Sequence, residues 1–207
     1  MAILAFDIYG TIFDVSSISK KLKVKESTSF LTEWRRKQIE YTWLSNILGK
    51  WIPFDEVTKL SLKYVSELFR VEFREELINL WDELEPFPDS KEISRLKEKH
   101  RLFALTNGVR ERVMKMLVNN SMGELFEEVV TAEEVKEYKP SRRVYEHFMR
   151  KVNAKEIYLV SSNPFDVIGS KNAGMKAIYV KRGVFDPIGY SPDFIVQGLN
   201  EIYKLNI

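Results

Sequence analysis

The sequence MAILAFDIYGTIFD, residues 1–14, sets the architecture that this chain is expected to adopt. It opens with a short apolar run, which predicts a buried strand because its side chains gain nothing from contact with water. The run ends on the carboxylate of Asp7, and Gly10 permits a sharp turn directly after it. Open α/β sheets bind their ligands at the carboxyl ends of core strands. Asp7 is therefore expected at a ligand site.

Further buried strands are predicted by apolar segments that are rich in β-formers. The clearest are residues 101–105, 156–160 and 176–180, while 126–130 is a shorter candidate and 194–196 an edge strand. Amphipathic segments that predict helices lie between them, at residues 90–99, 109–119, 142–152 and 166–173. Strands that alternate with helices imply right-handed crossovers. The predicted fold class is α/β, with a doubly wound, Rossmann-like parallel sheet.

Residues 15–85 have a different pattern from the rest of the chain. Apolar residues recur at helical spacing over 33–48, 54–69 and 72–84, and no strand-like run is present. The last of these segments is followed by Pro86-Phe87-Pro88, which cannot continue a helix. We therefore expect an all-helical cap domain at 15–85, inserted into a core domain made of 1–14 and 86–207.

The composition is that of an ordinary globular protein, with 44% hydrophobic and 30% charged residues. The 32 basic and 30 acidic residues are interspersed, and no basic stripe indicates a nucleic-acid partner. The chain has no cysteine, which excludes disulfides and thiolate metal sites. Its apolar runs are far shorter than the ~18 residues that a membrane span needs, and residues 1–6 are too short for a signal peptide. We expect a cytoplasmic protein without nucleic-acid or membrane partners.

Four further motifs carry polar residues that could serve a site. They are LTNG at 105–108, YKPSRRVY at 138–145, VSSNPFD at 160–166 and WRRKQIEY at 34–41. LTNG ends a predicted strand and opens a helix, whose N-terminus suits an anion. VSSNPFD ends another predicted strand.

In sequence order, residues 7–14, 105–108, 138–145 and 160–166 resemble the four motifs of the haloacid dehalogenase (HAD) superfamily. The last two resemble the forms found in its L-2-haloacid dehalogenase branch, and residues 34–41 are similar to that branch's cap helix. The resemblance spans almost the whole chain. It implies a HAD core with a helical cap, a homodimer, and hydrolysis of L-2-haloalkanoic acids to D-2-hydroxyalkanoic acids and halide.

Two positions separate this chain from the phosphatases of the superfamily. Tyr9 stands where phosphatases carry a second aspartate that protonates the leaving alkoxide, and a phenol with a pKa of about 10 replaces that acid poorly. Ser162 stands where they carry a metal-ligating aspartate, and Mg²⁺ prefers anionic oxygen ligands. A halide needs no proton to leave. The residues thus favour dehalogenation without a metal or another cofactor.

The resemblance assigns the covalent chemistry to Asp7. Its carboxylate would attack C2 of a small 2-haloacid, expel halide with inversion and form an ester, which water then hydrolyses at the Asp7 carbonyl. Lys139 would keep Asp7 ionised, since an opposite charge nearby favours the anion. Asp166, Asn163 and Ser161 would position or activate the hydrolytic water.

Substrate binding is assigned to both predicted domains. Arg35, helped by Asn107, would receive the departing halide. A cation ~4 Å from the developing charge contributes about 4 kcal/mol at an effective dielectric of 20, before desolvation is counted. Thr106 would hold the substrate carboxylate together with the backbone amides of Ile8 and Tyr9.

Supporting and variable positions complete the predicted site. Thr11 and Tyr145 would orient the reacting groups by hydrogen bonding. Phe165 stands beside the pocket where the branch often has tryptophan, and Thr106 stands where serine is commoner. Arg36 stands where glutamine is frequent, so the sequence leaves open which of the two adjacent arginines meets the halide.

Two alternative functions also stay open. The first is a small-molecule phosphatase of the same superfamily, which would release phosphate in a Mg²⁺-dependent reaction. The second is a non-catalytic scaffold that kept the fold. A scaffold has no need to keep Asp7, Lys139, Asn163 and Asp166 together, which favours an enzyme.

Overall fold

The structure, a computed structural model, describes residues 1–154, 156–184 and 188–207. They form two compact units, a core unit of Met1–Asp14 with Pro86–Ile207 and a cap unit of Val15–Glu85. The chain passes between these units at two short strands, β2 (Phe13–Asp14) and β3 (Glu85–Pro86), which pair with each other.

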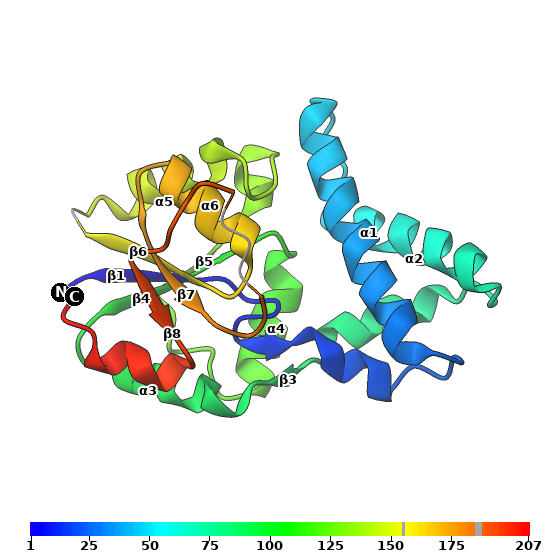
Figure 1. The fold of residues 1–207 in the computed structure, drawn as a ribbon, viewed down its shortest axis with the longest axis horizontal. Coiled ribbons are helices and arrows are strands. Elements are labelled where there is room, and N and C mark those ends of the chain that lie inside the picture. The colour runs from blue at the N-terminus through cyan, green and yellow to red at the C-terminus, as the bar shows by residue number, and fades with distance from the viewer. Residues whose placement is uncertain (155, 185–187) are drawn as a thin grey trace. The chain divides into compact units, whose positions relative to one another are not determined.

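The core unit is built on a six-stranded parallel sheet with the strand order β5-β4-β1-β6-β7-β8 (Figure 1). The strands are β1 (Ile3–Phe6), β4 (Arg101–Thr106), β5 (Glu128–Thr131), β6 (Ile157–Ser161), β7 (Lys176–Val180) and β8 (Phe194–Val196). In this register, Phe6 at the end of β1 lies opposite Ala104 and Val160. The predicted α/β fold is confirmed, and β5 begins two residues later than the sequence predicts.

Helices cover both faces of this sheet. Figure 1 shows α5 (Arg142–Val152) and α6 (Pro164–Asn172) on one face and α3 (Ile93–Leu96) and α4 (Arg110–Asn119) on the other. The remaining core turns are the 3₁₀ helices η3 (Pro88–Glu92), η4 (Ala132–Val135) and η5 (Leu199–Lys204). No helix among the described residues is long and apolar enough to cross a membrane.

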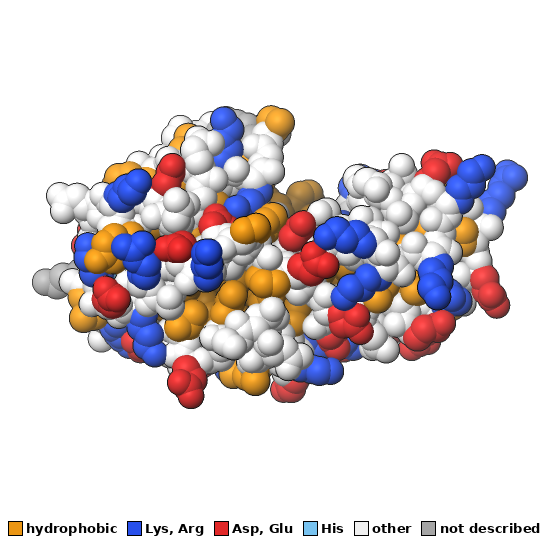
Figure 2. Space-filling model, turned by 90° about the horizontal axis from the view of Figure 1, so that it is seen from below, with side chains coloured by type: hydrophobic (Ala, Val, Ile, Leu, Met, Phe, Trp, Pro, Cys, Tyr) orange, Lys and Arg blue, Asp and Glu red, His pale blue; other side chains and the backbone are white. Residues whose placement is uncertain are grey.

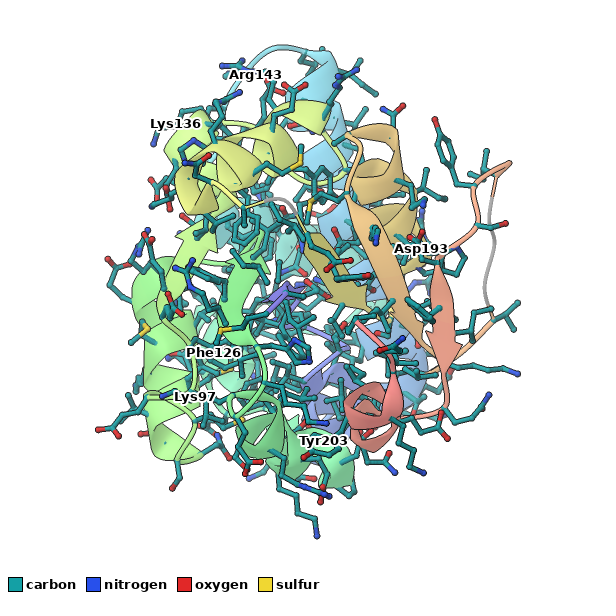
Figure 3. All side chains as sticks on the ribbon, turned by 90° about the vertical axis from the view of Figure 1, so that its left-hand side faces the viewer. Lys97, Phe126, Lys136, Arg143, Asp193 and Tyr203 are labelled. Carbon is teal, nitrogen blue, oxygen red and sulfur yellow. The ribbon has the colours of Figure 1, made fainter. Side chains whose placement is uncertain are left out.

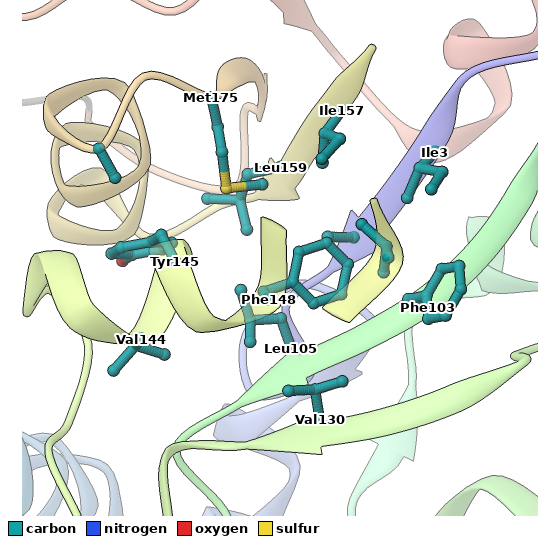
Figure 4. Packing of buried hydrophobic residues seen from close by; sticks show 13 residues of the cluster. Ile3, Phe103, Leu105, Val130, Val144, Tyr145, Phe148, Ile157, Leu159 and Met175 are labelled. Atoms are coloured by element: carbon teal, nitrogen blue, oxygen red, sulfur yellow. The ribbon is translucent and has the colours of Figure 1, made fainter. Parts of the chain in front are cut away.

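A buried cluster fixes α5 on the sheet. Val144, Tyr145 and Phe148 of α5 pack on Leu105 and on neighbouring strand residues (Figure 4). Burial of each such side chain contributes about 1.5–3 kcal/mol. The rotation of α5 is therefore set by its apolar face, which turns Tyr145 inward.

Hydrogen bonds and ring contacts fasten the outer elements of the core unit. Asp193, labelled in Figure 3 beside β7 and β8, accepts a hydrogen bond from Ala177 N (2.7 Å) and pairs with Lys171 (2.9 Å). Tyr203 of η5 lies under the Lys99 ammonium, 3.8 Å from the ring centre. On the face shown in Figure 2, basic and acidic side chains are interspersed.

Two predicted helices are shorter and tighter in the structure. The segment 90–99 begins as η3 and contains a single α turn, because Ser90 is held at its start: its N donates to Phe87 O (2.9 Å) and its Oγ to Ile12 O (2.7 Å). The segment 72–84 forms the 3₁₀ helix η2 (Glu75–Asp82) instead of an α-helix. The 3₁₀ form is common in short segments, at helix ends and in connections between elements.

The cap unit is an antiparallel helix pair. It contains η1 (Val15–Lys20), α1 (Ser27–Ile47), α2 (Phe54–Phe69) and η2. Trp34 of α1 is fully buried, and its Nε1 donates to Thr58 O (3.2 Å) and Ser61 Oγ (3.1 Å) of α2. Trp81 of η2 packs edge-on against Trp34, with ring centres 5.5 Å apart. Trp34 is thus a core residue of this unit.

A charge cluster braces the segment that leads to α5. The carboxylate of Glu134 accepts hydrogen bonds from Arg110 (2.6 Å), His147 (2.8 Å), Lys151 (2.9 Å) and the backbone N of Thr131 (3.1 Å). Burial alone would raise the pKa of Glu134, but the hydrogen bonds from His147 and Lys151 and the charge of Lys151 lower it to about 2. The ionised form of Glu134 therefore stabilises the fold.

We expect Glu134→Gln to lower the free energy of unfolding by about 1 kcal/mol at pH 7 after solvent screening, or about 2–4 °C in Tm. Because the folded pKa lies below the ordinary 4.5, this stabilisation is present above pH 4.5 and is lost as the pH falls toward 2. Thermal denaturation at several pH values measures it. The control, Glu146→Gln, removes one exposed pair with Arg142 and should change Tm little. An equal change of Tm in the two variants would contradict the conclusion that ionised Glu134 stabilises the fold.

Candidate active site

Asp7 lies directly after β1, at the carboxyl edge of the sheet. Its backbone N donates to Val160 O (3.0 Å), which continues the pairing with β6. The chain then turns sharply, with Gly10 at φ +84° and Gly10 N bonded to Phe13 O (2.8 Å). This φ favours glycine. The turn leaves Asp7 buried, with a side chain only 6% exposed, next to the end of β1.

Lys139 is the central group of the site. Its side chain is 2% exposed, and its Nζ donates to Asp7 Oδ1 (2.8 Å), Asp166 Oδ2 (2.7 Å) and Leu105 O (2.8 Å). An ammonium has three N–H donors, so all of them are satisfied. The two predicted partners Lys139 and Asp7 are therefore brought together, with Asp166 as a third member.

The protonation states follow from this arrangement. Burial alone would lower the pKa of Lys139, but Asp166 and Asp7 outweigh it and the pKa is raised. Burial raises the pKa of Asp166, and the charge of Asp7 adds to that, while Lys139 opposes it. Burial also raises the pKa of Tyr145 well above its usual value, so its neutral hydroxyl donates to Asp166 Oδ1 (2.6 Å).

The second oxygen of Asp7 is surrounded by donors. Oδ2 accepts hydrogen bonds from Asn163 Nδ2 (2.7 Å) and Thr11 Oγ1 (2.9 Å), with Ser161 Oγ at 3.5 Å. The only hydrogen bond that the described residues make to Oδ1 comes from Lys139. Since Oδ2 is saturated and Oδ1 is not, Oδ1 is the better placed nucleophile.

The amide of Asn163 lies where two oxygens converge. Its Nδ2 donates to both Asp7 Oδ2 and the backbone carbonyl of Tyr9 (3.0 Å). Both partners are acceptors, so the amide nitrogen, not its oxygen, must face them. Ser162 is also engaged, because its Oγ donates to Gly10 O (2.6 Å).

The described residues contain no group of three His, Asp or Glu side chains that could hold a metal ion.

The last residue of β4, Thr106, and the two residues after it border the same site. Thr106 Oγ1 accepts a hydrogen bond from Gly108 N (3.0 Å). Asn107 is bonded to the backbone of Lys139, accepting from its N (2.8 Å) and donating to its O (3.4 Å). Asn107 therefore positions Lys139, a role that the sequence did not predict. The ring of Tyr9 lies against Gly108, where a Cβ would come within 2.6 Å of it.

Gly169 is a further site residue that sequence reasoning missed. A Cβ built on it would come within 2.7 Å of the Tyr145 hydroxyl and of Pro140. Tyr145 can reach Asp166 only because position 169 carries no side chain. A glycine in the middle of helix α6 was the available signal, since such a residue often marks a close approach. Phe165 lies in the first turn of the same helix and is half-buried, and Ile8 is fully buried.

Arg35 and Arg36 lie in the cap unit with different partners. Arg36 is exposed and paired with Glu33 (2.6 Å) and Glu40 (2.8 Å). Arg35 is half-buried and borders a cavity of about 240 Å³. Its Nη1 donates to Oε1 of the buried Gln38 (2.6 Å). The partners of Arg36 leave Arg35 as the better candidate for an anion.

Residues 4–180 match the family described as haloacid dehalogenase-like hydrolase. The chain belongs to this family. The family and the hydrolase class predicted from the sequence are thereby confirmed.

Several members of the haloacid dehalogenase-like hydrolases are similar to this chain over nearly its whole length. Haloacetate dehalogenase H-2 of Moraxella sp. (strain B) is 32% identical, covering 98% of this chain and 96% of that protein. (S)-2-haloacid dehalogenase 2 of Pseudomonas sp. (strain CBS-3) is 29% identical, covering 98% and 94%. The solved structure of L-2-haloacid dehalogenase from Xanthobacter autotrophicus with covalently bound chloropropionic acid has a TM-score of 0.93 at 23% identity, covering 99% and 98%. At that identity it shows the fold alone.

We expect Lys139→Met to destabilise the core unit by about 3–5 kcal/mol, because it leaves two carboxylates buried without their counter-charge. The double variant Lys139→Met/Asp166→Asn removes one of these charges and should be more stable than the single variant. Thermal denaturation at pH 7 checks both. Lys136→Met, which removes a lysine with an exposed side chain paired to Glu133, is the control. A double variant less stable than Lys139→Met would show that repulsion is not the cause.

Proposed function

We propose that this protein hydrolyses L-2-haloalkanoic acids to D-2-hydroxyalkanoic acids and halide, with Asp7 as the nucleophile. The observation that carries the proposal is the Asn163 amide nitrogen bonded to both Asp7 Oδ2 and Tyr9 O. The Asn163 amide supplies hydrogen-bond donors to these two oxygens, whereas a metal-dependent member of the family would need a cation there. Relatives named haloacetate dehalogenase and (S)-2-haloacid dehalogenase support the same substrate class.

In the first step, Asp7 Oδ1 attacks C2 in line with the carbon–halogen bond. A C2–O bond forms, the carbon–halogen bond breaks, and halide leaves with the electron pair, which inverts C2. The Lys139 ammonium holds the attacking oxygen, Asp7 Oδ1, by an ion pair of 2.8 Å. Thr106 and the backbone amides of Ile8 and Tyr9 bind the substrate carboxylate, and Arg35 receives the halide.

In the second step, water attacks the carbonyl carbon of the Asp7 ester. The charge that develops on Oδ2 is stabilised by the donors already around it, Asn163 and Thr11, with Ser161 further away. Donors preorganised in this way make an oxyanion hole. Asp166, whose pKa is raised by burial, accepts the water proton, which then passes to the leaving 2-hydroxy oxygen. The step restores the Asp7 carboxylate with one oxygen from water, and the second water proton is released to solvent.

A phosphatase is less well supported by the same contacts. Tyr9 supplies no carboxylic acid for an alkoxide leaving group, and the Ser162 hydroxyl is bonded to Gly10 O.

The predicted homodimer has one candidate surface in the cap unit. The C-terminal part of α1 exposes the apolar side chains of Trp43, Leu44, Ile47 and Leu48. Contiguous exposed apolar side chains often mark protein–protein contacts. We propose a second copy of the chain as the partner.

The cytoplasmic location stays a prediction.

We expect chloride release from L-2-chloropropionate but not from the D isomer, at a rate that EDTA leaves unchanged. Asp7→Asn should release no chloride, because an amide lacks the nucleophilic charge. Chloride release and chiral analysis of the product measure these outcomes. Mg²⁺-dependent phosphate release without chloride would favour the phosphatase, and no activity of either kind would favour the scaffold.

We expect Arg35→Gln to lower kcat for L-2-chloropropionate about 100-fold, since ~4 kcal/mol of attraction at 4 Å is partly offset by desolvation. The adjacent Arg36→Gln is the matched control. Its guanidinium is already paired with Glu33 and Glu40, so kcat should change less than about twofold. Steady-state chloride release compares the two. If Arg36→Gln lowered kcat more than Arg35→Gln does, Arg36 and not Arg35 would be the residue that receives the halide.

A further inference from the structure

Arg182 is a mostly buried cation beside the site that the reaction above does not use. It follows β7, and its side chain is 17% exposed. Its Nη2 donates both to Asp89 Oδ1 (2.7 Å) and to the backbone carbonyl of Thr11 (3.1 Å). The guanidinium also stacks on Phe87, 3.9 Å from the ring centre.

The pairing with Asp89 alone does not account for this geometry. An arginine whose role is to neutralise a carboxylate usually forms two parallel bonds to it. Here Nη2 is shared between Asp89 and Thr11, and the buried Nε has no hydrogen-bond partner among the described residues. Asp89 Oδ2 is instead taken by the backbone N of Leu199 (2.8 Å). The guanidinium is thus oriented so that one N–H reaches the Thr11 carbonyl.

Thr11 connects Arg182 to the nucleophile. Its Oγ1 donates to Asp7 Oδ2 (2.9 Å) and accepts from Ser162 N (2.9 Å). The next residue, Ile12, is held through its carbonyl by Phe87 N (2.9 Å) and Ser90 Oγ. Arg182 therefore fixes the carbonyl end of the residue whose hydroxyl end touches Asp7.

We propose that Arg182 is a positioning residue that acts through Thr11 on Asp7 Oδ2. The inference rests on the proposed function, in which Oδ2 becomes the carbonyl oxygen of the ester and carries the charge during its hydrolysis. The Thr11 hydroxyl therefore matters most in the second step. Halide release precedes that step and depends on Oδ1.

The expected kinetic signature separates this role from a merely structural one. Arg182→Gln should lower kcat about tenfold, by analogy with the outer residues that orient metal ligands, whose loss commonly costs 10–100-fold in affinity or activity. KM should fall by a similar factor as the ester accumulates, so kcat/KM stays within about threefold. Arg182→Lys keeps a donor and should recover part of kcat. A structural defect would instead lower kcat and kcat/KM together.

A double-variant cycle with Thr11→Val completes the test. If Arg182 acts through the Thr11 hydroxyl, the variant Thr11→Val/Arg182→Gln should have the same kcat as Thr11→Val. Arg101→Gln, which breaks the ion pair with Glu127 at the start of β4, is the control and should leave both kinetic constants unchanged. The proposal would be overturned if the loss of kcat in the double variant were the product of the losses in the two single variants. Unchanged kinetic constants in Arg182→Gln would overturn it as well.

A structural readout keeps this test independent of the proposed function. In a crystal structure of Arg182→Gln, the Thr11 Oγ1 to Asp7 Oδ2 distance should lengthen from 2.9 Å to beyond hydrogen-bonding range. An unchanged distance would overturn the inference whatever the substrate. A wild-type protein that releases no halide would refute the proposed function alone.

Discussion

The buried ammonium of Lys139, held between Asp7 and Asp166, is the interaction on which the rest of the site depends. A charge removed from water must be paired and hydrogen-bonded. Further residues are needed to hold these three groups in place. Asn107 fixes the backbone of Lys139, and Tyr145 satisfies the second oxygen of Asp166. Gly169 in turn leaves room for Tyr145.

Strand order explains how residues so distant in sequence converge. β1 lies at the centre of the sheet with β4 and β6 on either side, so the carboxyl ends of all three strands meet. Asp7 follows β1, Leu105 O belongs to β4, and Asp166 lies in the helix after β6. This is the position where α/β sheets form their ligand sites. The turn at Gly10 then ends the run of β1, and the cap unit begins a few residues further along the chain, at Val15.

Much of the core could be predicted from sequence because its signals are local. The strands are short apolar runs, and the polar groups Asp7, Thr106 and Ser161 stand at their ends. The bounds of η2 and η3 could not be predicted, because anchoring contacts such as Ser90 to Ile12 decide them. For the same reason, only tertiary packing showed the backbone role of Asn107. The partners of Arg36, in contrast, lie three and four residues away, which is a spacing that sequence alone could have revealed.

The amide of Asn163 has a consequence for how this fold could change its chemistry. An amide that points two protons at Asp7 and Tyr9 O repels any cation that approaches the same oxygens. A carboxylate placed at position 162 alone would leave the Asn163 amide donor between the two oxygens, and only a phenol, which is a poor acid, at position 9. Under the proposed function, a change from this sequence to metal-dependent chemistry therefore needs substitutions at more than one of positions 9, 162 and 163. That requirement would help to keep the two chemistries apart as sequences diverge.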